Sequence, residues 1–307
     1  MKKIKWLATG GTISCIPTRN GLSPAAAEEQ MNDMLHKIPG TGAEIFPECI
    51  MNIDSSDISC DDIRRIGISV HKTIEEGFDG IVITHGTDTM AYTSAMLRKM
   101  IVSPPVPVII TGSQRPFYSE NSDGKNNLFN SLKAALNDTL KDVFLLFGDK
   151  LIRGDLAHKE YTHSDNAFIS SSGYTGIIKD GTLLLNDISE YSGEYSFNAD
   201  YNENVMLIKL TPVTDISIFF YAVDRGVRGI VIEGYGTGGI PHRLLDGIAY
   251  AANKGIKIML ISQCLHEGID MSIYEVGVSA AKLGVISGGK MTAEAAVAEM
   301  MFMLGTL

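Results

Sequence analysis

Hydroxyl and carboxylate side chains gather in three short segments of the sequence, each placed directly after an apolar run. Residues 9–12 read Thr-Gly-Gly-Thr, residues 54–57 read Asp-Ser-Ser-Asp, and residues 84–90 read Thr-His-Gly-Thr-Asp-Thr-Met. Acyl transfer needs a nucleophile, a proton relay and donors that bind the developing oxyanion. The three segments contain groups suited to these tasks, so they predict covalent catalysis by a hydroxyl group.

Thr12 is the candidate nucleophile. The two glycines before it allow a sharp turn and leave backbone N–H groups unshielded. A threonine hydroxyl is a weak nucleophile at neutral pH, so it needs a base or a relay nearby. Alternatively, the segment is only a turn in which the Thr12 hydroxyl satisfies a backbone group.

Thr87 and Asp88 are candidates for the relay. Thr87, Asp88 and Thr89 are all residue types that commonly cap a helix, which is the competing explanation. One cap is enough, so the other polar side chains could face a ligand. Lys159 is usually expected to be a solvated surface group. A buried lysine beside an aspartate can instead take part in proton transfer, because its pKa shifts readily.

The segment 54–57 combines groups for both ends of an α-amino acid. The hydroxyls of Ser55 and Ser56, at the start of a helix, would suit a carboxylate. Asp54 and Asp57 would suit an ammonium group. Helix capping is the competing explanation for the same residues.

Apolar runs rich in Val, Ile and Leu alternate with amphipathic stretches along the chain, which is typical of a doubly wound α/β fold with a mostly parallel sheet. The expected strands are 4–8, 80–84, 106–111, 143–147, 205–210, 229–233 and 256–262. The expected helices are 61–76, 89–101, 125–137, 217–225, 242–253 and 293–304. Ligands of such sheets bind beyond the carboxyl ends of the strands, so the turns after residues 8, 84 and 111 are expected to converge.

The composition changes over residues 187–204, which lack periodicity. We therefore expect an N-terminal catalytic α/β domain at 1–186, a linker at 187–204 and a smaller α/β domain at 205–307. Residues 14–27 contain Pro17, Asn20-Gly21 and Pro24, which favours a loop that could act as a lid over Thr12. Residues 113–127 are expected to form another long turn.

The net charge of −10 and the lack of a basic stripe argue against a nucleic-acid partner. No apolar run approaches the roughly 20 residues of a membrane helix, so we expect no membrane association and a cytoplasmic location. The four cysteines are expected to be reduced thiols. The scattered histidines form no zinc motif, so no metal site is expected.

The sequence resembles the bacterial-type L-asparaginases, and more closely their cytoplasmic type I branch. The resemblance covers nearly the whole chain. It rests on the segments 9–13, 54–57 and 85–90, on Thr-Gly-Ser-Gln-Arg-Pro at 111–116, on Asp-Gly-x-x-Asn at 123–127, on Arg153-Gly154 with Lys159, on Gly-Tyr-Gly-Thr-Gly at 234–238 and on Gln263-Cys264. It implies a flavodoxin-like N-terminal domain and hydrolysis of L-asparagine to L-aspartate and ammonia, with minor activity on L-glutamine allowed.

Residue roles follow from the resemblance by position. It implies that Thr12 forms the acyl-enzyme and that Thr87, Asp88 and Lys159 form a second triad. Asp88 would also hold the substrate ammonium group, and Ser55 its carboxylate. Asp54 and Ser56 would belong to the same binding turn as Ser55, and the backbone around Ser113 would lie near the scissile amide. The resemblance also implies dimers or tetramers and no metal or organic cofactor.

Two alternatives stay open. Many members carry a tyrosine in the loop after the nucleophile, where this chain has Leu22, so the group that activates Thr12 is not identified. A catalytically weak or silent amino-acid-binding protein of the same fold is therefore one alternative. The other is the amidase subunit of a tRNA-dependent amidotransferase, for which an additional N-terminal domain and a basic surface would be expected.

Overall fold

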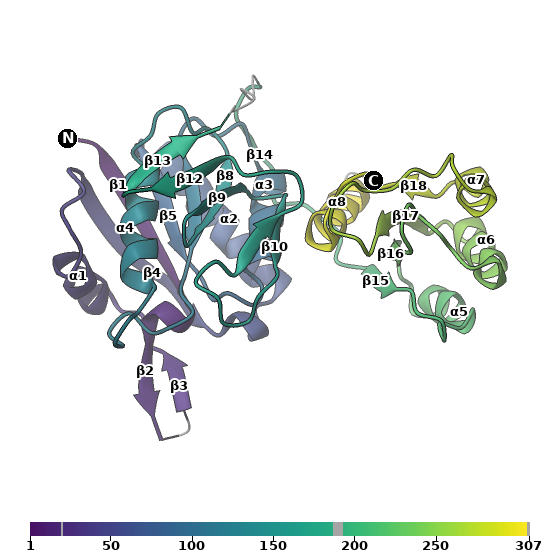
Figure 1. The fold of residues 1–307 in the computed structure, drawn as a ribbon, viewed down its shortest axis with the longest axis horizontal. Helices are drawn as coiled ribbons and strands as arrows, with labels where there is room; N and C mark the ends of the chain where they lie inside the picture. Colours follow the sequence, from purple (N-terminus) through teal and green to yellow (C-terminus); the bar gives the residue numbers. More distant parts are fainter. Residues whose placement is uncertain (20, 187–192, 306–307) are drawn as a thin grey trace. The chain divides into compact units, whose positions relative to one another are not determined.

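A computed structural model describes residues 1–19, 21–186 and 193–305, and the chain divides into two compact units, Met1–Ala199 and Asp200–Leu307 (Figure 1). Each unit is built from a β-sheet with helices on both faces. The two-domain α/β fold predicted from the sequence is confirmed. No helix of the described residues combines the length and the apolar character needed to cross a bilayer.

The N-terminal unit contains an eight-stranded mixed sheet. Five neighbouring strands are parallel, and the other three continue the sheet in antiparallel fashion. In spatial order the strands are β13 (Thr182–Leu185), β12 (Gly176–Lys179), β9 (Lys150–Arg153), β8 (Val143–Phe147), β7 (Val108–Thr111), β5 (Gly80–Thr84), β1 (Lys3–Gly10) and β4 (Glu44–Ile53). The parallel half holds the strand ends that matter for the candidate site.

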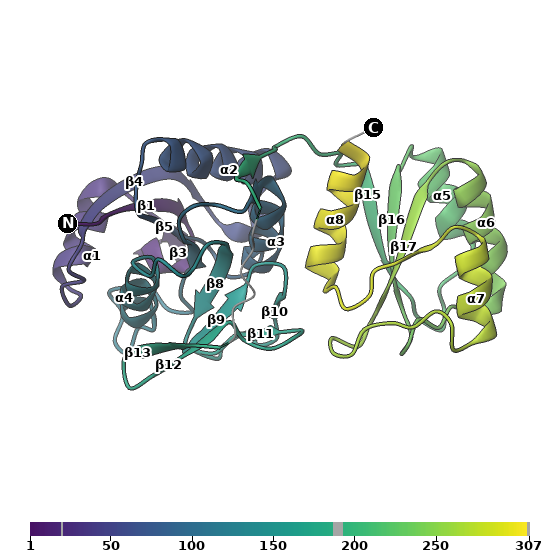
Figure 2. The ribbon, with the colours of Figure 1, turned by 90° about the horizontal axis from the view of Figure 1, so that it is seen from above.

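Helices cover both faces of this sheet (Figure 2). Successive side chains of a strand point to opposite faces. Ile4, Trp6 and Ala8 accordingly share one core cluster with residues of α1 (Glu28–His36) and α4 (Gly124–Ala134). The other face is covered by α2 (Cys60–Glu75) and α3 (Met90–Met100). Burial on both faces explains why these strands are continuous apolar runs without polar alternation.

The C-terminal unit has a four-stranded parallel sheet of β15 (Val205–Lys209), β16 (Gly229–Gly234), β17 (Lys257–Ser262) and β18 (Ile286–Ser287). One face packs against α5 (Ser217–Asp224), α6 (Leu245–Asn253) and α7 (Glu275–Lys282). The other face packs against α8 (Ala293–Gly305), whose Met300 and Leu304 are buried. Figure 2 shows α8 alone on its side of this sheet.

Residues 14–27 are not an irregular loop, so this expectation is corrected. They include the antiparallel hairpin of β2 (Cys15–Thr18) and β3 (Gly21–Pro24), which extends away from the large sheet (Figure 1). The Thr18 hydroxyl donates to the Gly21 carbonyl at 2.7 Å and holds the end of the hairpin. The prolines are tolerated because a two-stranded hairpin has only edge strands.

Two other boundaries differ from expectation. The turn that begins at Ser113 ends earlier, because α4 begins at Gly124. Residues 187–192 of the predicted linker lie outside the described residues. Later in that segment, β14 (Ser196–Phe197) pairs with β6 (Ile101–Val102) inside the N-terminal unit, and Phe197 stacks on His71 at a ring distance of 4.3 Å.

Candidate active site

The candidate site lies at the carboxyl ends of β7, β5, β1 and β4, which are consecutive neighbours in the sheet. All four strands run in parallel, so their final residues meet at one edge. This order brings together the segments that begin at residues 112, 85, 11 and 54. The segments are far apart in the sequence, and the sheet topology alone makes them neighbours.

Two glycines let these turns touch through their backbones. Gly11 has a φ of +75°, and a Cβ built on it would lie 2.4 Å from the backbone nitrogen of Gly86. A Cβ on Gly86 would in turn lie 2.5 Å from the Ser55 hydroxyl. No residue with a side chain fits in either place. The turns that carry Thr12, Thr87 and Ser55 are therefore in direct contact.

Thr12 begins a single 3-10 turn, η1 (Thr12–Ser14), immediately after Gly11. Its side chain is half-buried. The neighbouring Ser14 hydroxyl and Cys15 thiol both donate to the Gly11 carbonyl, at 3.0 and 3.5 Å. Among the described residues, the Thr12 hydroxyl itself has no hydrogen-bond partner, so it is available to a ligand.

Lys159 joins Thr87 and Asp88. It ends β10 (Ala157–Lys159), which pairs with β11 (Phe168–Ser170). Its Nζ donates to Thr87 Oγ1 at 2.8 Å and to Asp88 Oδ1 at 2.5 Å. The lysine side chain is 18% exposed and that of Asp88 is 62% exposed. The Thr87 oxygen thus accepts from the lysine side chain, and within the described part of the chain no acceptor takes the Thr87 hydroxyl proton.

The segment 54–57 forms the 3-10 turn η2 (Ser55–Asp57). Asp54 accepts hydrogen bonds from the backbone N–H and the hydroxyl of Ser56, both at 2.9 Å. Ser55 is buried, and its hydroxyl oxygen accepts the Asp88 N–H at 3.2 Å. Of the predicted binding residues in this turn, Ser55 lies against Asp88, whereas Asp54 and Ser56 bond to each other.

His85 has a role that the sequence did not predict. It is fully buried, and burial lowers its pKa to about 4, so the imidazole is neutral at physiological pH. Its Nδ1 donates to the Gly86 carbonyl at 2.7 Å, so Nε2 is left to accept from the Thr93 hydroxyl at 3.1 Å. The ring thus holds the Gly86 carbonyl, directly after the His85–Gly86 peptide on which Gly11 packs.

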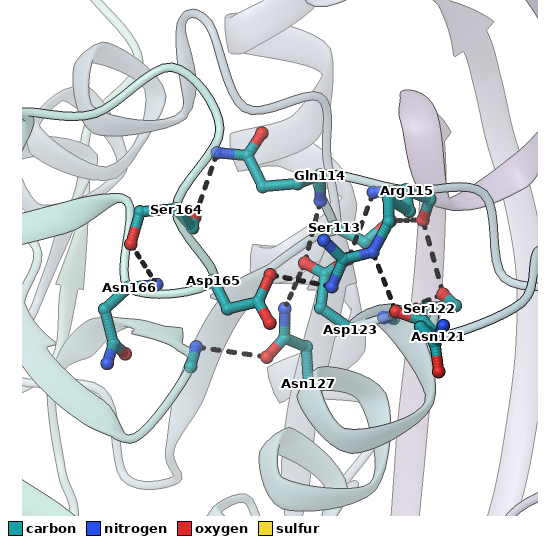
Figure 3. A network of polar contacts seen from close by, with 12 residues as sticks. Ser113, Gln114, Arg115, Asn121, Ser122, Asp123, Asn127, Ser164, Asp165 and Asn166 are labelled. Atoms are coloured by element: carbon teal, nitrogen blue, oxygen red, sulfur yellow. Dashed lines mark hydrogen bonds and ion pairs between the residues drawn. The ribbon is translucent and has the colours of Figure 1, made fainter.

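Ser113 is fully buried, and its hydroxyl donates to the Arg115 carbonyl at 2.5 Å. The prediction for this segment concerned the backbone around Ser113. The Ser113 hydroxyl itself does not face solvent. A polar network around the buried Asp123 and Asn127 holds the turn (Figure 3). The sequence motif contained both residues but indicated no function for them.

The match to family models agrees with this fold. Residues 3–189 match the family model described as "Asparaginase, N-terminal", and residues 204–306 match "Glutaminase/Asparaginase C-terminal domain". The chain therefore belongs to the asparaginase family, as its resemblance implied.

Particular relatives support the type I branch. The chain is 38% identical to the L-asparaginase of Thermococcus kodakarensis, over 99% of this chain and 93% of that protein. The structure of a thermostable L-asparaginase from T. kodakarensis superposes with a TM-score of 0.92 over 99% of this chain and 93% of that chain. L-asparaginase I from Vibrio cholerae is 30% identical, with a TM-score of 0.88 over 98% of this chain and 92% of that chain.

A second group of relatives has another name. The chain is 33% identical to a glutamyl-tRNA(Gln) amidotransferase subunit of Pyrococcus furiosus, over 97% of this chain and 71% of that protein. The relatives of this chain thus include proteins named L-asparaginase and proteins named as amidotransferase subunits.

Proposed function

We propose that this protein hydrolyses L-asparagine to L-aspartate and ammonia through a threonine acyl-enzyme. The observation that carries the proposal is the contact of Lys159 with Thr87 and Asp88, on a turn that touches the turn of Thr12. The Thr12 hydroxyl has no hydrogen-bond partner among the described residues. The hydroxyl of Thr12, the proposed nucleophile, and the polarised hydroxyl of Thr87 thus lie on two turns that are in contact. The relatives named L-asparaginase support the same substrate.

In the proposed first half-reaction, Thr12 Oγ1 attacks the side-chain amide carbon of asparagine. The bond from this carbon to nitrogen breaks, and the departing nitrogen takes a proton to leave as ammonia. Thr87 would pass this proton, because its oxygen already accepts from Lys159. The proton that Thr12 loses when its oxygen bonds to carbon restores the Thr87 hydroxyl, so the step neither gains nor loses a proton overall. Water then attacks the ester, and L-aspartate leaves as the Thr12 hydroxyl is restored.

Substrate recognition is proposed to rest on Asp88 and Ser55. The exposed Asp88 carboxylate suits the α-ammonium group. The Ser55 hydroxyl accepts the Asp88 N–H, so its own hydrogen is free to bind the α-carboxylate. Asp54 and Ser56 would set the geometry of this turn, while the backbone beside Ser113 would border the amide.

We further propose a cytoplasmic location and self-association into dimers or tetramers. A neighbour called "Probable Cytoplasmic L-asparaginase", from Campylobacter jejuni, supports the location. It is 26% identical, with a TM-score of 0.84 over 99% of this chain and 95% of that chain. A mass measurement in solution would test the oligomer, and a monomer would contradict it.

The second candidate is the amidase component of a tRNA-dependent amidotransferase, which the relatives named as amidotransferase subunits favour. The two candidates differ in what the chain does alone. The proposed asparaginase releases ammonia from free L-asparagine without tRNA. A protein that releases ammonia only in the presence of aminoacylated tRNA and a partner would belong to the second class.

The deciding experiment measures ammonia release from L-asparagine and from L-glutamine. We expect rapid release from asparagine and slower release from glutamine. Binding of asparagine without release would overturn the proposal and favour a silent amino-acid-binding protein.

A further inference from the structure

The carboxylate of Asp123 is more than nine-tenths buried. It accepts hydrogen bonds from the backbone of the turn after β7 and not from the backbone of the helix α4 that it precedes. Its side chain is 4% exposed. Oδ2 accepts the backbone N–H of Gln114 at 2.8 Å, and Oδ1 accepts that of Arg115 at 3.0 Å. Asp123 directly precedes α4, where a carboxylate would commonly cap the helix, yet it makes no capping hydrogen bond there. Two successive N–H groups of the turn after β7 therefore converge on one buried anion.

Asn127 extends this network to the next strands. Its Nδ2 donates to the Gly112 carbonyl at 2.9 Å, and its Oδ1 accepts the Gly148 N–H at 3.0 Å. It thus joins the end of β7 to the turn between β8 and β9. The next residue of that turn, Asp149, donates its N–H to Oδ1 of Asn166 at 3.1 Å. Two amide side chains, Asn127 and Asn166, therefore connect the end of β7 with the segment 164–166 through the turn at residues 148 and 149. Figure 3 shows Asn127 between Asp123 and this turn.

Two direct contacts join the same segments. Gln114 Nε2 donates to the Ser164 carbonyl at 3.2 Å. Arg115 forms an ion pair with Asp165 at 2.7 Å. The segment 164–166 lies between β10, which ends in Lys159, and β11. The polar network thus spans both the turn beside the proposed scissile amide and the loop that follows the proposed relay lysine.

We propose that Asp123 and Asn127 are positioning residues for the reaction. They hold the turn 113–115 and the segment 164–166 in one arrangement, and they touch neither substrate nor reacting atoms. The proposal rests on the proposed function of the site. A carboxylate is required at 123, because only an acceptor without hydrogens can receive both N–H groups and the Asn127 amide.

The variant Asp123→Asn tests the proposal with little change in shape. Its amide nitrogen would face an N–H donor, so one bond to the turn is lost. We expect kcat for asparagine to fall roughly 10- to 100-fold while KM changes less than about threefold. Asn127→Asp, which faces the Gly112 carbonyl and the Asp123 carboxylate with acceptors only, should have the same effect. Asp138→Asn is the control: it breaks only the exposed ion pair with Lys2, outside this network, and kcat should stay within about twofold.

Amide hydrogen exchange supplies a readout that does not depend on activity. In Asp123→Asn, the amides of Gln114 and Arg115 should exchange at least about tenfold faster while those of β5 and β7 keep their protection. An unchanged kcat, or unchanged exchange at 114 and 115, would overturn the positioning role. Faster exchange throughout the sheet would also overturn it, since the residue would then serve general stability. If the wild type released no ammonia, the proposed function would fail, while the exchange result would still report on the turn.

Discussion

Lys159 Nζ donates a hydrogen bond to the hydroxyl oxygen of Thr87 at 2.8 Å. The two residues are 72 positions apart in the sequence, and they meet because β10 lies beside the helix α3 that follows the Thr87 turn. The ammonium group withdraws electron density from a hydroxyl whose own proton is free. From the sequence alone, Thr87 could be explained as a helix cap. Its contact with Lys159 makes it a candidate proton donor.

Replacing Lys159 should therefore lower the rate of the chemical step more than it weakens substrate binding. We expect Lys159→Met to lower kcat by about 10²- to 10⁴-fold, the range typical of a lost proton-transfer group. Lys159→Arg should not restore the rate, because a planar guanidinium group does not reproduce the single Nζ that donates to both Thr87 and Asp88. Steady-state ammonia release measures both variants. Full activity of Lys159→Met would remove Lys159 from the mechanism.

Gly11→Ala should disrupt the contact between the turns that carry Thr12 and Thr87. Its Cβ would lie 2.4 Å from the Gly86 nitrogen, in a backbone conformation that disfavours side chains. The expected loss of stability is roughly 3 kcal/mol or more, because overpacking adds to backbone strain. Gly21→Ala is the matched control. Its φ is also positive, at +118°, but its Cβ would meet nothing within 4 Å.

The comparison separates strain from contact. For Gly21→Ala we expect a loss of about 1–2 kcal/mol, from strain alone. Denaturant unfolding of both variants gives the two free energies. Equal losses would mean that the approach of Gly11 to Gly86 has no energetic consequence.

His85 should make the stability depend on pH in the acid range. Burial lowers its pKa from 6.5 to about 4 in the folded protein. Above pH 6.5 both states are neutral at this residue, and its contribution is fully present. As the pH falls from 6.5 to about 4, only the unfolded state gains the proton, so stability declines by about 3 kcal/mol in total.

The variant His85→Gln keeps a donor and an acceptor but does not titrate. We expect its unfolding free energy to fall less than that of the wild type between pH 6.5 and 4. The difference between the two pH profiles isolates the histidine from the carboxylates that titrate in both proteins. Parallel profiles would show that His85 is not kept neutral by the fold.

The main strands could be predicted because burial on both faces leaves a local signal. The runs at 80–84 and 143–147 were predicted with the bounds that β5 and β8 have. The antiparallel strands β13, at the edge of the sheet, and β12, next to it, were missed because they carry exposed residues such as Ile177 and Leu184. The hairpin β2–β3 was missed because its prolines favour a loop reading.

The candidate site was predictable as a set of residue types but not as a geometry. The sequence placed Thr12, Thr87 and Ser55 at strand ends, and parallel pairing then predicts their convergence. It did not reveal that Asp54 bonds to Ser56, since a carboxylate near a serine has several local partners. Nor did it reveal the role of Asp123, whose partners lie eight and nine positions earlier and depend on the folded turn.

The central claim is that Thr12 is the nucleophile of an asparagine hydrolase, and one measurement tests it most directly. Ammonia release from L-asparagine is followed for the wild type and for Thr12→Ala under the same conditions. The proposed mechanism predicts turnover by the wild type and a loss of at least about 10³-fold in the variant, which cannot form the ester. A variant that kept the wild-type rate, or a wild type that bound asparagine without releasing ammonia, would contradict it.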